Sequence, residues 1–176
     1  GLDSVKEELQ ATADHFLRRG IATLAIDGPG QGETEFLRDI EPAYEDPAGA
    51  AIDWLQARDD IDGDRVGVYG VSLGGYYAVR VAALEPRVKA TIELAGTYSL
   101  ASNWENRSVV SRDAFVKRSG ARRDDEARAF AGTLGLAGLG APIQHPLLAL
   151  PGHPAPPHPL PPPPPPRRPR PPAPAL

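Results

Sequence analysis

Apolar runs of strand length alternate with helix-like segments along the first 150 residues of the chain. Residues 21–26 form a mainly apolar run of strand length, which fits a strand buried on both faces of a parallel sheet. Shorter strand patterns follow at residues 65–69 and 88–94. Strands and helices that alternate with short links build parallel βαβ units. The sequence therefore predicts an α/β fold, in one domain over residues 1–150.

Two helices are expected around the first strand. The first covers residues 4–20, with Ser4 and Glu7 at capping-box spacing and Gly20 as its stop. The second begins with Asp46 as N-cap and a proline in its first turn. Both helices would then flank the parallel sheet.

The later part of the chain carries further elements. A helix is expected over residues 73–84, because Pro86 ends it. The segment 99–139 is polar and helical in patches, with one helix opened by residues 124–126, and could form an insertion over the site. A last strand begins within residues 143–150, although a proline inside this run weakens the pattern.

The string Gly70-Val71-Ser72-Leu73-Gly74-Gly75 stands between a strand pattern and an alanine-rich helix pattern. In this context Gly-x-Ser-x-Gly makes a sharp turn that exposes the serine hydroxyl, and Gly70 and Gly74 leave the space that this tight turn needs. The N–H group of Leu73 would face a developing negative charge at the helix N-terminus. Ser72 is therefore the candidate nucleophile, and the alternative is a serine in a strand-to-helix turn without a catalytic role.

A second glycine-rich string, Asp27-Gly28-Pro29-Gly30-Gln31-Gly32, follows the first predicted strand. It lacks both the Gly-x-Gly-x-x-Gly spacing and a Gly-Lys-Ser/Thr ending. A tight loop at the carboxyl end of the strand is the better interpretation, and a nucleotide site the weaker one.

Several separate motifs together resemble α/β-hydrolases related to 2,6-dihydroxypseudooxynicotine hydrolase and the FrsA-type esterases. The resemblance runs from Gly1 to about Leu148, and the motifs that carry it are Gly1-Leu2-Asp3-Ser4, Asp27-Gly28-Pro29-Gly30-Gln31-Gly32, Arg65-Val66-Gly67-Val68, Gly70-Val71-Ser72-Leu73-Gly74-Gly75-Tyr76-Tyr77-Ala78 and Glu85-Pro86-Arg87. It implies an α/β-hydrolase fold with an incomplete parallel sheet, since in this fold one strand would precede Gly1. It also implies Ser72 as nucleophile and the backbone of Leu73 and Leu2 as the oxyanion hole.

The catalytic acid and histidine of that family have no match in this chain. Glu93 at a strand end and Glu105 in Trp104-Glu105-Asn106-Arg107 are the alternative acids, with plain surface or strand-end charges as the competing interpretation. His153 and His158 stand among prolines that offer no packing to hold an imidazole. His15 and His145 are more simply read as structural or solvent-facing residues.

Composition narrows the classes of partner. The chain is 41% hydrophobic and 24% charged with a net charge of -4, which is too small to favour nucleic acid or membrane, so a small-molecule substrate is expected. It has no cysteine and no apolar run long enough to span a bilayer, which favours a soluble, cytoplasmic protein. No metal or organic cofactor is implied. The chain also has no methionine, so we expect it to be a fragment.

Residues 151–176 form a proline-rich tail, with 15 prolines among 26 residues. Such a segment buries no core and is expected to be disordered or polyproline II. As an authentic tail it could bind an SH3-type partner through its prolines and arginines. A GC-rich gene read out of frame would also yield Pro, Arg and Ala, and this better explains why the resemblance ends where the tail begins.

The predicted function is that of a serine-nucleophile hydrolase acting on an ester, or on an activated ketone by C–C bond cleavage, in a small molecule. As this fragment the chain is expected to be inactive and poorly folded. The alternative is a non-catalytic degenerate hydrolase, or a scaffold that uses the proline-rich tail.

Overall fold

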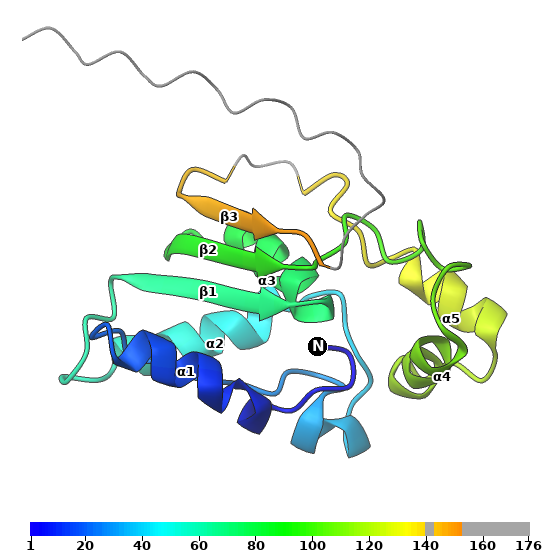
Figure 1. Ribbon diagram of the computed structural model, residues 1–176, viewed down its shortest axis with the longest axis horizontal. Coiled ribbons are helices and arrows are strands. Elements are labelled where there is room, and N and C mark those ends of the chain that lie inside the picture. Colours follow the sequence, from blue (N-terminus) through cyan, green and yellow to red (C-terminus); the bar gives the residue numbers. More distant parts are fainter. Residues whose placement is uncertain (140–142, 153–176) are drawn as a thin grey trace, which may run out of the picture.

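A computed structural model describes residues 1–139 and 143–152 of the chain. A parallel three-stranded sheet in the order β1-β2-β3 forms its centre (Figure 1). Tyr69 pairs with Ile92, and Ile92 pairs in turn with Leu148, so the spatial order of the strands is their order in the sequence. The strands are β1 (Val66–Val71), β2 (Val88–Leu94) and β3 (Leu147–Leu150). The predicted α/β fold with a parallel sheet and flanking helices is confirmed.

Helices cover the sheet and the carboxyl ends of its strands. α3 packs on β1 and β2 and also contacts α2, whereas α4 and α5 lie beyond the arrowheads of the strands (Figure 1). The α-helices are α1 (Gln10–Leu17), α2 (Glu45–Gln56), α3 (Leu73–Leu84), α4 (Val109–Arg118) and α5 (Asp124–Ala131), and the 3₁₀ helices are η1 (Lys6–Leu9) and η2 (Gly32–Phe36).

The first helix starts later than the sequence indicated, and without its predicted capping box. η1 begins at Lys6, and its N-cap Val5 makes no side-chain cap. The carboxylate of Asp27 accepts the Lys6 backbone N–H instead, at 2.8 Å. A residue far along the chain thus binds a backbone N–H at the start of this helix, where local spacing had predicted a bond between Ser4 and Glu7, and this is a tertiary effect.

The predicted strand at residues 21–26 is wrong. Among the residues that the structure describes, this segment pairs with no strand, and Ile21 and Leu24 are 50% and 41% exposed. A strand exists only where a neighbour accepts and donates its backbone hydrogen bonds. A gap of about 350 Å³, lined by Leu24, Ala25 and Ile26 on one side and by residues 66–71 on the other, separates the segment from β1.

Other boundaries differ little from expectation. α3 and β2 have the predicted bounds, and β1 continues to Val71. The predicted N-cap Asp46 is wrong, because α2 begins at Glu45 with Tyr44 as its N-cap, which places Asp46 inside the first turn. β3 is shorter than residues 143–150, because Pro146 has no N–H for a ladder and the strand begins after it. The helix opened by residues 124–126 is confirmed as α5. The tail from residue 153 lies outside the described residues.

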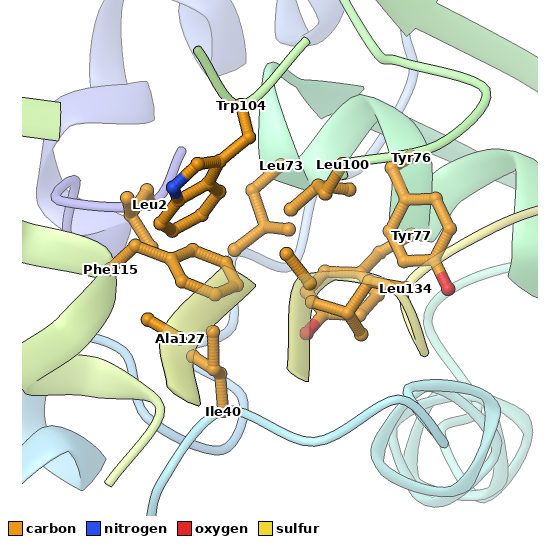
Figure 2. Packing of buried hydrophobic residues seen from close by; sticks show 11 residues of the cluster. Leu2, Ile40, Leu73, Tyr76, Tyr77, Leu100, Trp104, Phe115, Ala127 and Leu134 are labelled. Atoms are coloured by element: carbon orange, nitrogen blue, oxygen red, sulfur yellow. The ribbon is translucent and has the colours of Figure 1, made fainter. Parts of the chain in front are cut away.

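The largest buried cluster lies at the carboxyl end of the sheet rather than beneath it. Trp104 and Phe115 meet edge to face with ring centroids 5.3 Å apart, beside the start of α3 (Figure 2). Leu2 and Leu73 belong to the same cluster. The segment after β2, together with α4 and α5, is therefore held directly against the turn that carries Ser72.

Candidate active site

Ser72 occupies the turn between β1 and α3 with φ 57° and ψ −117°, and its side chain is exposed. A non-glycine residue with positive φ is uncommon and costs on the order of 1–3 kcal/mol. Such strain persists only where the surrounding structure imposes it. The exposed position of the Ser72 hydroxyl at the end of the sheet therefore comes with a strained backbone that destabilises the fold.

Hydrogen bonds on both sides hold the strained turn. The Ser72 N–H donates to the carbonyl oxygen of Leu94 at 2.8 Å, which extends the β1–β2 ladder by one residue. The Tyr76 N–H donates to the Ser72 carbonyl at 3.2 Å and starts α3. Ser72 is thus tied to both the sheet and the helix.

The crowded glycines of the motif are not the predicted pair. A Cβ atom on Gly70 would overlap the carbonyl group of Gly74, so Gly70 is required as expected. A Cβ on Gly74 would meet nothing nearer than the Gly1 nitrogen at 3.9 Å. Gly75 is the second crowded position, because its Cβ would lie 2.9 Å from Gly96. The close approach is between α3 and the segment after β2.

Ser72 opens into a cavity of about 120 Å³ at the carboxyl end of the strands. Both residues predicted for the oxyanion hole, Leu2 and Leu73, line this cavity. Neither backbone N–H donates a hydrogen bond to any residue that the structure describes. The full lining is Leu2, Asp3, Ser72, Leu73, Thr97, Leu100, Arg107, Ser111 and Phe115.

The glycine-rich loop at residues 27–32 holds the segment that contains Leu2. Asp27 accepts bonds from the backbone N–H and the ammonium of Lys6, and Gln31 Nε2 donates to the Gly1 carbonyl at 3.1 Å. Three carboxylates, that of Glu33 first, raise the pKa of Lys6. The loop therefore binds its own chain, with an acidic group turned inward, as a tight loop rather than a phosphate loop.

The two alternative acids do not line the cavity. Glu93 is buried in β2, and its carboxylate accepts the backbone N–H of Gly96 in the following turn. Glu105 is exposed and pairs with Arg128 at 2.9 Å. Glu93 thus stabilises the turn beside Gly75, and Glu105 forms a surface ion pair.

No histidine of the described residues lines the cavity. His15 is exposed on α1. His145 precedes β3, where its Nε2 lies 2.9 Å from the hydroxyl of Thr91 in β2. His153 and His158 lie outside the described residues.

The structure adds polar residues that sequence reasoning did not select. Asp3, Thr97, Arg107 and Ser111 share the cavity with Ser72. Arg107 is two positions from Glu105, and the sequence carried no signal to prefer one over the other. Their different surroundings depend on how the segment after β2 folds back over α3.

Within the described part of the chain, no three His, Cys, Asp or Glu side chains gather where they could hold a metal ion. In the same residues, no helix is long and apolar enough to cross a membrane.

A parallel α/β sheet with a strained, exposed serine at the carboxyl end of a strand defines an α/β-hydrolase. The family described as X-Pro dipeptidyl-peptidase (S15 family) matches residues 2–132, and the chain belongs to this family of α/β-fold hydrolases.

Similar proteins are themselves named as hydrolases. The 2,6-dihydropseudooxynicotine hydrolase of Paenarthrobacter nicotinovorans is 38% identical over 128 residues, which are 73% of this chain and 35% of that protein. The hydrolase ORFZ of Pyricularia oryzae is 43% identical over 110 residues, 56% of this chain and 25% of its own length.

A solved structure agrees with the fold. The crystal structure of 2,6-dihydroxy-pseudo-oxynicotine hydrolase superposes with a TM-score of 0.81 at 35% identity, over 85% of this chain and 42% of that one. The chain therefore spans less than half the length of these relatives.

Proposed function

We propose that Ser72 is the nucleophile of a hydrolase that cleaves an ester, or the C–C bond beside an activated ketone, in a small molecule. The observation that carries this proposal is the positive φ of an exposed Ser72 that shares a cavity with Leu2 and Leu73. The similarity to hydrolases of small molecules supports the same class of substrate.

In the proposed reaction, the Ser72 Oγ attacks the substrate carbonyl carbon and gives its proton to a base. The N–H groups of Leu73 and Leu2 stabilise the oxyanion, because both stay free of hydrogen bonds to described residues. The leaving group departs with a proton, and water then releases the acyl group from Ser72. The cavity of about 120 Å³ admits a small acyl group.

A second candidate function rests on the missing base. No histidine of the described residues lines the cavity, and the acid that does, Asp3, is exposed at its rim. A serine without a base retains only the contribution of the oxyanion hole and of substrate binding. The alternative is therefore a non-catalytic member of the family, or a scaffold that uses the proline-rich tail.

Sequencing the gene around the codon for Leu150 separates the two candidates. If the protein is a hydrolase, another reading frame should encode an acidic residue directly after this strand. The same frame should encode a histidine within roughly a few tens of residues of that acid. Frames without such residues make the tail authentic and favour the non-catalytic protein.

The nucleophile is tested with a fluorophosphonate probe on the protein made from its complete gene. We expect labelling at one serine, loss of labelling in Ser72→Ala, and retention in Ser111→Ala, which removes the other serine of the cavity. Labelling that persists in Ser72→Ala, or that maps to another serine, would refute the assignment.

A further inference from the structure

Arg107 places a positive charge in the same cavity as Ser72. It lies in the segment between β2 and α4, is partly buried, and lines the cavity together with Thr97 and Ser111. Its backbone N–H donates to the carbonyl oxygen of Trp104 at 3.1 Å, so a fully buried residue of the core holds its main chain. The main chain of Arg107 is thus tied to the packed side of the site.

The Arg107 guanidinium has no counter-ion within the described part of the chain. Its side chain forms no ion pair or hydrogen bond there, and its Nε is buried without a partner. Burial lowers the pKa of Arg107. Two other arginines of this region have carboxylate partners. Arg112, whose Nε is also buried without a hydrogen bond, lies 3.8 Å from the carboxylate of Asp124, and Arg118 pairs with Glu35.

A partly buried cation without a partner is costly unless something compensates it. Asp3, the acidic group on the same cavity, is exposed and lies beyond ion-pair distance of Arg107. The chain therefore supplies no anion from its described residues. A substrate group can supply one, since a guanidinium binds a carboxylate through two parallel hydrogen bonds.

We propose that Arg107 binds a carboxylate of the substrate, so that the ester or ketone cleaved at Ser72 carries a nearby acidic group. The inference rests on the proposed function, and it names the substrate class of that site. Because one small cavity holds both residues, the carboxylate and the scissile carbonyl belong to the same short portion of the substrate.

Binding of benzoate and of its neutral isostere benzamide tests the charge preference without any turnover. Calorimetry on the protein from its complete gene should show benzoate binding at least about tenfold more tightly than benzamide, a preference that Arg107→Gln abolishes. Arg128→Gln, which removes an exposed arginine outside the cavity, should keep it. Equal binding of the two probes to the unchanged protein, or a preference that survives Arg107→Gln, would overturn the proposal.

Arg107→Lys provides a second variant with the charge retained and the planar fork removed. It should bind benzoate more weakly than the unchanged protein does, because an ammonium lacks the two parallel donors, and benzoate binding equal to that of the unchanged protein would overturn the bidentate contact. Benzoate should also slow fluorophosphonate labelling of Ser72 in the unchanged protein. In Arg107→Gln, benzoate should leave the rate of labelling unchanged. If Ser72 is never labelled, the proposed function fails, while the comparison of benzoate with benzamide still decides the role of Arg107.

Discussion

The amide of Gln31 donates a hydrogen bond from Nε2 to the carbonyl oxygen of Gly1, 3.1 Å away. Gln31 is 6% exposed, and its partner directly precedes Leu2 in the chain. The glycine-rich loop thereby positions the segment that supplies one proposed oxyanion N–H. Gln31 thus contacts a residue 30 positions before it in the sequence, in the segment that reaches the cavity of Ser72.

Replacing Gln31 with leucine should slow the reaction of Ser72. Leucine fills much of the same volume but leaves the Gly1 carbonyl without its donor. The loss of this hydrogen bond should lower the free energy of unfolding by about 1 kcal/mol. Displacement of the Leu2 N–H should reduce the rate of fluorophosphonate labelling by about 10- to 100-fold. Gln10→Leu, which removes an exposed bond to Asp14, is the control and should leave the rate unchanged. An unchanged labelling rate in Gln31→Leu would show that the glycine-rich loop does not position the Leu2 N–H.

Gly70→Ala should destabilise the protein by about 3 kcal/mol or more, because the new methyl group overlaps the carbonyl of Gly74 inside the turn. Gly67→Ala is the matched control in the same strand. Its methyl group would meet the Ala90 carbonyl at 3.3 Å, so the cost should be about 1 kcal/mol or less. Denaturant unfolding of the protein from its complete gene measures both. Similar costs at the two positions would contradict the steric argument.

The ion pair between Glu45 and Arg80 should make stability depend on pH. Two hydrogen bonds of 2.6 Å join the pair between α2 and α3. Burial alone would raise the pKa of Glu45, but the bonds from Arg80 outweigh it and the pKa is lowered from 4.5. A lowered pKa in the folded state adds stability above pH 4.5, and this stability is lost as the pH falls through the folded value.

Unfolding free energies measured between pH 7 and pH 3 should therefore fall more steeply for the unchanged protein than for Glu45→Gln. Glu105→Gln, which removes an exposed ion pair with Arg128, is the control for the loss of a surface charge. Parallel curves for Glu45→Gln and the unchanged protein would show that the pair contributes nothing to acid sensitivity.

The 176-residue chain taken alone should be only marginally stable. Residues 21–26 and the facing edge of β1 have no ladder partner among the described residues, and a gap of about 350 Å³ lies between them. Each backbone group left buried without a partner costs about 1–3 kcal/mol, against a net stability of about 5–15 kcal/mol for a domain. We expect no cooperative thermal transition by circular dichroism. A cooperative transition with ester turnover that Ser72→Ala abolishes would contradict this.

Elements with local causes were predictable from the residues alone. The bounds of α3 and β2 follow from apolar spacing and from Pro86, and the turn at Ser72 follows from a glycine motif between a strand and a helix. In these places the residues that begin and end the element lie within a few positions of one another. The parallel sheet followed from the same alternation of elements.

Elements with distant causes required the folded chain. Residues 21–26 have the composition of a strand, yet a ladder needs a neighbour that no local pattern can supply. Glu105 and Arg107 are equally polar and two positions apart, but one reaches the surface and the other enters the cavity of Ser72. Hydrogen-bond partners and burial are set by residues far apart in sequence, so only the packing of the segment after β2 against α3 could separate these two side chains.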